Sequence, residues 1–453
     1  MATMVKKKLT VRKTVNKHIP SEEEKIASRR AVRVAERVKK TREGLLRKPF
    51  WRVDGQAESL GLVLIWFLNL YLVVPFFGRE AFITSYSGPM IPFLAKIIGL
   101  TGLPLSYGFE VVNIVFFLLF PVTFYIFMRR VSGKTLVAFL AGLMVSLPLS
   151  PFAGARLRAV FYSVEGPHMA SLAIVPVAMM GMMSFLHDGG LRNLVVSSLA
   201  SALVALISPF GLLTYLMFAG IGTFSEVLLG RGRLKIFRAV TALVLAGALC
   251  SFWYNPGFFF WLVSGPMGQE VRIMLSRLLP ISFFTLPVLG AFGYLLFDRK
   301  PDLQPLFLST FLTIAFLVIL MAGRGFIFSA PSRYIPELGI SLAFLFGIGA
   351  EKLGEYLMEN REKWEWAKKG GGVLIRGSMV LIVGLMVSGI VLGKSGLLSH
   401  TEVLGFWTGV ERGELWQARE RFKGFYSWFG FVITGTAAVI LGWMWGKSKR
   451  KFS

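Results

Sequence analysis

The charged side chains that flank the long apolar runs of this chain are the places where chemistry could occur. The stretch "FFGREAFITSYSGP" (76–89) follows the first apolar run and places Glu80 beside Arg79. A carboxylate here could take a proton from a hydroxyl group or bind a divalent metal ion through oxygen. Alternatively, the two residues form an ion pair at the membrane surface, where the guanidinium disfavours protonation of the carboxylate. The stretch is therefore either a catalytic loop or the solvated end of a helix.

A second pair of candidates, Glu165 and His168, flanks the dipeptide Gly-Pro at the start of a later apolar run, in "SVEGPHMA". These residues could supply a second acid and a polar contact to a substrate. Ionisable groups at membrane depth cost several kcal/mol unless they are paired or face water, so each is a functional hypothesis. The alternative is a helix N-terminus, where the helix dipole favours an acidic residue.

Arginines outnumber carboxylates among the charged residues on the expected outward side. A planar guanidinium can bind two phosphate oxygens at once, so this excess suits an anionic ligand such as a lipid-linked phosphate or pyrophosphate. The candidates are Arg333, Arg156 and Arg158. The sequence lacks the motifs of soluble enzymes, such as a P-loop, a dinucleotide fingerprint or a zinc-binding HExxH.

The composition places these candidates in a membrane. Hydrophobic residues make up 54% of the 453 residues and charged residues 17%, and the mean hydropathy is +0.62. The first share is higher and the second lower than in ordinary soluble domains. Apolar runs of roughly 18 to 22 residues recur, each long enough to cross about 30 Å of hydrocarbon as a helix. We therefore expect an all-α integral membrane protein with no large soluble domain.

About twelve transmembrane helices are expected, near 57–77, 109–128, 134–150, 168–186, 192–207, 209–228, 236–253, 279–297, 304–322, 336–352, 373–393 and 427–446. Lys and Arg gather in alternate connections, and the positive-inside rule then places both termini in the cytoplasm of a multi-pass protein of the cell membrane. The outward segments mix aromatic residues with Pro and Gly, which predicts interfacial helices there. The longer of these segments are 78–108, 151–167, 254–278 and 394–426.

The N-terminal segment is basic: the formal charge of the chain is +25, and 16 Lys or Arg precede residue 51. We expect a cytoplasmic segment at 1–52 that is partly an amphipathic helix, a transmembrane domain at 53–446, and a basic cytoplasmic tail at 447–453. The basic segment suits anionic lipid headgroups or a protein partner. Nucleic acid is disfavoured, because no aromatic interleaving or known binding motif accompanies the charge.

Several stretches resemble the polytopic GT-C type glycosyltransferases and their archaeal relatives. "SVEGPHMASLAIVPVAMMGMMSFL" followed by "LRNLVVSSLASALVALISPFGLLTYLMF" is similar to their middle helices. "SAPSRYIPELGISLAFLFGIGAEKL" is similar to a later segment, in which an arginine precedes a helix rich in small residues. The resemblance covers about residues 57–355. It implies a GT-C-like helix arrangement and transfer of a sugar from a polyprenyl-phosphate donor at the outer membrane face.

The resemblance also implies roles for single residues. GT-C enzymes place one or two acidic residues, usually Asp, in the first outward loop as general base and as ligand of a divalent metal ion, Mg²⁺ or Mn²⁺. Glu80 is the matching position, although it is not an Asp and has no second acid beside it. Arg333, in "SRY", matches the late loop and becomes the first candidate for the donor phosphate, followed by Arg156 and Arg158.

Three functions are compatible with these features. The first is a glycosyltransferase of the GT-C type. The second is a non-catalytic GT-C-like scaffold or a subunit of a membrane complex, which would keep the helices and the lipid groove without the acidic pair. The third is a transporter or lipid flippase, for which prolines within the spans would permit broken helices. Those prolines are Pro121, Pro148, Pro176 and Pro287.

Overall fold

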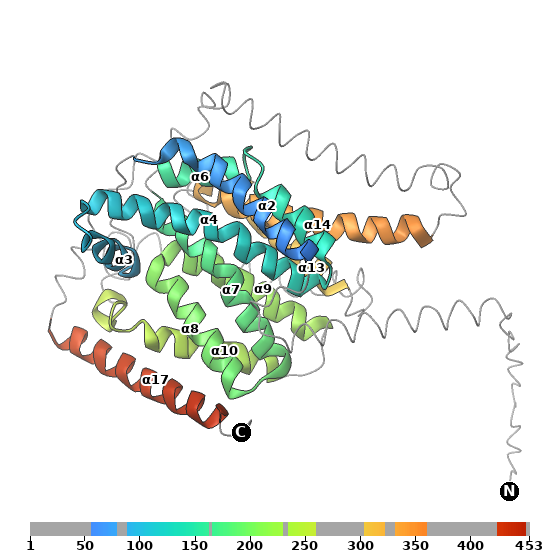
Figure 1. Cartoon of the computed structure of the whole chain (residues 1–453). Coiled ribbons are helices and arrows are strands. Elements are labelled where there is room, and N and C mark those ends of the chain that lie inside the picture. The colour runs from blue at the N-terminus through green and yellow to red at the C-terminus, as the bar shows by residue number, and fades with distance from the viewer. Residues whose placement is uncertain are drawn as a thin grey trace, which may run out of the picture. The chain divides into compact units, whose positions relative to one another are not determined.

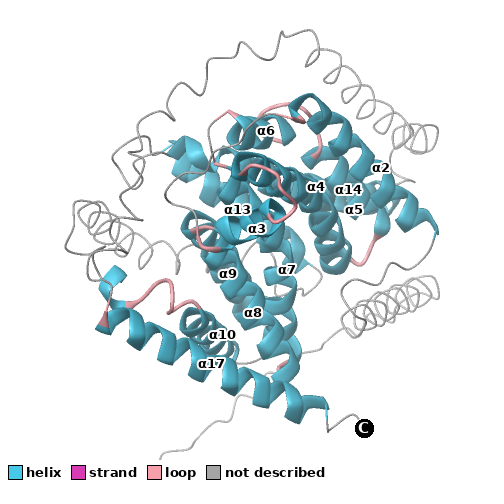
Figure 2. Cartoon of the chain, turned by 60° about the vertical axis from the view of Figure 1, so that its left-hand side comes forward, coloured by secondary structure: helices cyan, strands magenta, loops and turns pink. Residues whose placement is uncertain are grey.

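The computed structural model describes residues 56–78, 88–162, 165–229, 234–259, 303–321, 331–359 and 424–449. Every regular element in these ranges is a helix (Figures 1 and 2), which confirms the all-α class. The chain divides into two units, Met1–Lys48 and Pro49–Ser453, and the first lies outside the described residues. Arg79, Glu80 and the expected spans at 279–297 and 373–393 also lie outside them.

The other ten expected spans correspond to helices. They are α2 (Gln56–Val73), α4 (Leu105–Ser132), α5 (Thr135–Val145), α7 (Gly166–Asp188), α8 (Leu191–Ile207), α9 (Pro209–Leu229), α10 (Leu234–Leu249), α13 (Gln304–Met321), α14 (Ile335–Glu359) and α17 (Phe425–Lys449). Within the described ranges, five of these helices are long and apolar enough to cross a membrane, namely α2, α4, α7, α9 and α17. The total of twelve spans stays a prediction.

Two shorter helices lie in the segments that were expected to hold interfacial helices, α3 (Met90–Gly99) and α6 (Ala153–Phe161). In α3, Ile91 and Ala95 are buried while Phe93 and Ile97 are exposed. Residues four apart share a helix face, so α3 has one face against the bundle and an apolar face away from it. The helices are therefore confirmed, and their position at a membrane surface stays a prediction.

Proline and glycine define several helix boundaries. Pro209 is the first residue of α9, a position where its missing N–H would have no partner within the helix. The turn between α7 and α8 consists of Gly189 and Gly190, whose φ angles are +69° and +83°. Glycine adopts such angles without the steric penalty of a Cβ atom, so the chain can reverse in two residues.

Helix α7 is the core of the described bundle. It packs against α4, α6, α8, α9 and α10, and Figure 1 shows it beside α4, α8 and α9. Of its most apolar stretch 89% is buried, compared with 22% in α2 and 17% in α17. A polar side chain at the start of α7 therefore lies among helices and not at the edge of the bundle.

Helices α7, α9 and α14 begin at one end of the bundle, which we call the Glu165 end. At the opposite end, basic residues pair with acids of other elements. Arg129 Nε lies 3.2 Å from Glu58 Oε1, Lys134 Nζ lies 2.6 Å from Glu351 Oε1, and Lys235 pairs with Glu226. Ion pairs between different elements therefore join the helices at this end.

Helix α14 approaches the backbone before α6 closely at Gly339. A Cβ atom on this glycine would lie 2.1 Å from the carbonyl oxygen of Pro151. Contacts this short do not occur between real atoms, so a larger residue would push the two segments apart. Gly349, ten residues further along α14, has open space around its Cα.

We expect Gly339→Ala to lower the free energy of unfolding by roughly 1–3 kcal/mol, because overpacking against backbone cannot relax by a side-chain movement. Gly349→Ala is the matched control, and it should leave stability unchanged or raise it by up to about 1 kcal/mol through helix propensity. Thermal unfolding of both variants in the same detergent provides the comparison. Equal midpoints for Gly339→Ala and Gly349→Ala would contradict the close approach.

Candidate functional site

The Glu165 end places two carboxylates at helix starts. Glu165 is the N-cap residue of α7, and Glu337 lies in the first turn of α14. Glu337 directly follows Pro336, and Glu165 precedes Pro167 by two residues. Proline is favoured in a first turn because its N–H is not needed there. The positive end of each helix dipole stabilises negative charge at these positions.

A buried ionic cluster joins α7 to the start of α14. It consists of Glu165, His168, Arg333 and Glu337, which are all less than 5% exposed. Arg333 Nη2 lies 2.7 Å from Glu165 Oε1, and His168 Nε2 lies 2.7 Å from Glu337 Oε1. Arg333 belongs to the short 3-10 turn η3 (Pro331–Tyr334) that leads into α14. The ionic cluster therefore consists of two contacts, Glu165–Arg333 and His168–Glu337, which we call its two rungs. Each rung joins the start of α7 to the segment that begins α14.

Helix α9 supplies a third wall of the ionic cluster. The Thr214 hydroxyl donates a hydrogen bond of 2.9 Å to Glu337 Oε1. The Phe210 ring lies under the guanidinium, with Arg333 Cζ 3.8 Å from its centroid. The His168 ring lies against Phe210 and Tyr334, with centroid distances of 6.1 and 5.9 Å. The charges are thus enclosed by aromatic rings and by one hydroxyl group.

Burial makes the internal pairing of the ionic cluster essential. A charge moved from water into a helix bundle loses several kcal/mol of hydration unless a counter-charge and hydrogen bonds replace it. Glu165 and Arg333 each supply the counter-charge that the other needs, and Glu337 Oε1 accepts hydrogen bonds from His168 and Thr214. Glu337 Oε2 and His168 Nδ1 are buried and make no hydrogen bond within the described part of the chain.

Arg156 of α6 forms a separate polar group. Its Nη2 donates hydrogen bonds to the carbonyl oxygen of Val145 at 2.9 Å and to Asn69 Oδ1 at 3.3 Å. The guanidinium lies over the rings of Phe117 and Phe120, 4.8 and 4.4 Å from their centroids. These contacts are cation–π interactions, which partly replace the lost hydration.

Arg156 keeps its charge in this environment. Burial lowers its pKa to about 9, which is still above neutral pH. Among the described residues no carboxylate lies within 4.0 Å of it, and its Nε and Nη1 atoms make no hydrogen bond there. A buried cation with unused donors suits an anionic ligand.

The structure brings together three of the residues chosen from sequence, Glu165, His168 and Arg333. Arg156 is not joined to them by any contact of the described residues. Arg158 lies two positions further along α6 and is half-buried. Residues two apart on a helix do not face the same side, so Arg158 does not share the position of Arg156.

The loop that contains Arg79 and Glu80 is attached on both sides by described residues. Gly78 N–H donates a hydrogen bond of 2.6 Å to Glu110 Oε1 on α4. Gly88 N–H donates one of 2.9 Å to the carbonyl oxygen of Ile207 at the end of α8. The roles expected for Arg79 and Glu80 stay predictions, because both residues lie outside the described ranges.

Sequence reasoning counts Glu337 among the outward ionisable residues without giving it a role, and it does not single out Thr214 or Phe210. A signal for Glu337 exists, since it follows Arg333 by four residues, which is about one helical turn. The signal for Thr214 and Phe210 is weaker, because nothing in "SPFGLLTYL" shows which side of α9 faces α14. Within the described residues no group of three His, Cys, Asp or Glu could hold a metal ion, and Glu80, the residue expected to bind one, lies outside them.

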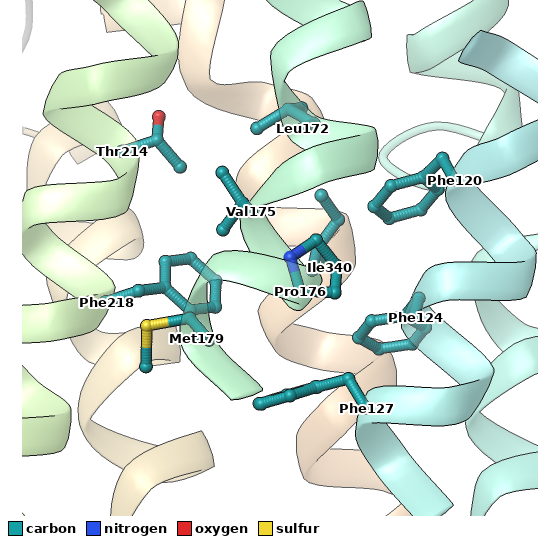
Figure 3. A pocket seen from close by; sticks show the side chains of 10 residues that line it. All are labelled: Phe120, Phe124, Phe127, Leu172, Val175, Pro176, Met179, Thr214, Phe218 and Ile340. Carbon is teal, nitrogen blue, oxygen red and sulfur yellow. The ribbon is translucent and has the colours of Figure 1, made fainter. Parts of the chain in front are cut away.

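A narrow apolar pocket lies between α4, α7, α9 and α14 (Figure 3). Its one polar side chain is Thr214, which also binds Glu337. Phe120 lines it from α4 and also contacts Arg156. The pocket therefore borders the ionic cluster on one side and the Arg156 group on the other. The remaining lining residues are Phe124, Phe127, Leu172, Val175, Pro176, Met179, Phe218 and Ile340.

Comparison with known proteins identifies the class. A family model described as a 6-pyruvoyl-tetrahydropterin synthase related domain, membrane protein, matches residues 86–297. The chain is a polytopic membrane protein. The matched range includes Glu165, His168 and Arg156 and ends before Arg333 and Glu337. No curated protein and no solved structure matches the chain.

We expect Arg333→Met to lower the free energy of unfolding by roughly 3–5 kcal/mol, because it leaves Glu165 buried and unpaired. The double variant Glu165→Gln/Arg333→Met should be more stable than Arg333→Met alone, since it removes both charges. A double-mutant cycle of thermal unfolding in detergent measures the coupling. Additive effects of the two changes would contradict a direct ion pair between these residues.

Proposed function

We propose that this membrane protein transfers a sugar from a polyprenyl-phosphate donor to an acceptor at the outer membrane face, as the GT-C glycosyltransferases that it resembles do. The observation that carries the proposal is the ionic cluster, where Glu165, His168 and Arg333 meet although His168 and Arg333 are 165 positions apart in sequence. An acid, an imidazole and a guanidinium in a site without bulk water suit group transfer.

The arginines have distinct roles in this proposal. Arg156 carries an unneutralised charge with two nitrogens that hydrogen-bond to no described residue, and we assign it to the donor phosphate. Arg333 is neutralised by Glu165, so in this proposal the donor phosphate takes the place of the Glu165 carboxylate when it binds Arg333.

Glu80 is the acid to which the resemblance assigns the role of general base or of ligand to a divalent metal ion, and both roles remain proposals. The attachment of Gly78 to α4 and of Gly88 to the end of α8 supports them. The second anchor, Ile207, ends α8 two residues before α9 starts at Pro209. The Gly88 end of the loop is therefore close in sequence to the start of α9, whose Phe210 contacts the ionic cluster.

The second candidate function is a non-catalytic scaffold or a subunit of a membrane complex. The observation that favours it is the internal pairing of the ionic cluster, since a structural lock between helices needs the same contacts. In this case the basic segment 1–52 binds anionic headgroups or a cytoplasmic protein. A transporter is less well supported, because α4 and α7 continue across Pro121 and Pro176 as unbroken helices.

The proposal predicts that a labelled polyprenyl-phosphate-linked hexose binds to the purified protein in lipid nanodiscs and is turned over. Arg156→Lys and Arg333→Lys keep the charge but lose the planar fork, and each should weaken donor binding by roughly 10- to 100-fold. Glu80→Gln should abolish turnover and leave binding intact. Glu355→Gln, at the opposite end, is the control.

Native mass spectrometry for binding and release of labelled hexose for turnover are the two measurements. Full turnover by Glu80→Gln would show that this residue is not the base. A wild-type protein that binds no donor and co-purifies with a stoichiometric protein partner would favour the scaffold.

The positive-inside rule predicts that the Glu165 end faces outward. In a Cys250→Ala background, which removes the one cysteine of the chain, Tyr162→Cys and Asp188→Cys place single thiols near the two ends of α7. Tyr162 is 64% exposed, and the side chain of Asp188 is 46% exposed. A membrane-impermeant maleimide should label Tyr162→Cys in intact cells and Asp188→Cys only after permeabilisation. The reverse pattern would invert the topology.

A further inference from the structure

The imidazole of His168 is held through one of its two nitrogens. Nε2 lies 2.7 Å from Glu337 Oε1, and the Thr214 hydroxyl donates to the same oxygen. A carboxylate oxygen only accepts, so Nε2 carries the hydrogen in this contact. A neutral imidazole then has a bare lone pair on Nδ1.

Nδ1 is the unused end of this pair. It is buried and makes no hydrogen bond within the described residues, and the side chain of His168 is 1% exposed. The rings of Phe210 and Tyr334 flank the imidazole, with centroids 6.1 and 5.9 Å from its own. An imidazole whose Nε2 is held by a carboxylate, and whose Nδ1 has no hydrogen-bond partner, has the arrangement of a base that activates a nucleophile.

The other acids of the ionic cluster are already engaged. Glu165 accepts from Arg333 at 2.7 Å, and Glu337 Oε1 accepts from both His168 and Thr214. Taking a proton at either of these engaged oxygens would break an existing contact. Glu337 Oε2 makes no hydrogen bond within the described residues, but a proton there would neutralise the carboxylate that holds His168. Nδ1 of His168 can take a proton while its bond to Glu337 is kept, and the resulting imidazolium would face a carboxylate.

We propose that His168 Nδ1 accepts the proton of the acceptor hydroxyl, with Glu337 as the positioning residue that holds the ring. The inference rests on the proposed transferase function and names a base within the described site, which leaves Glu80 the other role that the resemblance implies, that of ligand to a divalent metal ion. The acceptor oxygen forms a bond to the anomeric carbon of the donor sugar. The bond from that carbon to the phosphate oxygen breaks with its electron pair on the phosphate, and the acceptor proton goes to Nδ1.

The location of Arg333 fits this division of tasks. Its guanidinium lies on the Phe210 ring at 3.8 Å, and the same ring contacts His168. The base and the cation therefore lie on neighbouring sides of one aromatic ring. A donor phosphate near the cation would bring its anomeric carbon toward an acceptor held at Nδ1.

Two substitutions distinguish the roles of the two ring nitrogens of His168. In His168→Gln the side-chain amide reaches the position of Nε2 and can still donate to Glu337, while nothing replaces Nδ1. In His168→Asn the amide reaches the position of Nδ1 only, so the contact with Glu337 is lost. His187→Gln is the matched control, because it makes the same change near the other end of α7, where the side chain is 49% exposed.

The probe is a labelled polyprenyl-phosphate-linked hexose in nanodiscs with water as acceptor, and the readout is released hexose. Loss of a general base lowers the rate by roughly 10²- to 10⁴-fold. We expect His168→Gln to lose at least about 100-fold with an unchanged unfolding midpoint, and His187→Gln to match the wild type. A purely structural His168 predicts the opposite, namely a rate kept in His168→Gln and a lower unfolding midpoint in His168→Asn.

A second measurement does not depend on turnover. The chain has 4 histidines, so nitrogen-15 labelling of histidine gives few signals, and His168→Gln identifies those of residue 168. We expect separate signals for a protonated Nε2 and a bare Nδ1 at neutral pH. A protonated Nδ1 in the free protein would overturn the inference. If the wild type releases hexose and His168→Gln releases it equally, the inference about His168 fails and the proposed function stands. If the wild type releases no hexose, both fail.

Discussion

The burial of four ionisable side chains between two helix starts is the constraint on which the rest of the described bundle depends. Each rung of the ionic cluster joins α7 to the segment that begins α14, and neither rung tolerates loss of one partner without leaving a buried charge. Because α7 is also the most enclosed helix, this requirement fixes the register of α14 against the core. Thr214 extends it to α9.

Close backbone contacts let the helices meet at the distances that these pairs need. At Gly211 on α9 an added Cβ atom would lie 1.7 Å from Ser171 Oγ, and at Gly166 on α7 it would lie 2.3 Å from Asn113 Oδ1. Both glycines are within one turn of the ionic cluster, at the starts of their helices. Small residues at these positions allow three helix starts to converge, as is common where helices pack in membranes.

The sequence predicted the helices well, because a run of apolar residues long enough to cross a membrane is a local property. Ten of the expected spans coincide with described helices, often to within a few residues at each end. The sequence also drew attention to Glu165, His168 and Arg333, since ionisable groups beside such runs are rare.

The sequence did not indicate which of these ionisable groups are partners. His168 and Glu337 are 169 positions apart, and their contact depends on how α7 and α14 are rotated about their axes. Arg156 and Arg158 illustrate the same limit: they are equivalent in sequence terms, and only packing distinguishes the buried one from the half-buried one.

The two rungs of the ionic cluster are chemically unequal, and this difference bears on whether the site is a lock or a reactive centre. Arg333 and Glu165 satisfy each other and together carry no net charge, so this rung is adequately explained by stability alone. The second rung is not, because it keeps a bare imidazole nitrogen and a free carboxylate oxygen in a place where unsatisfied polar atoms are costly. A structural lock would be more stable with an apolar pair of the same volume at these positions. The two free atoms of His168 and Glu337 therefore agree with the proposed ligand or proton at this rung, which packing alone would not require.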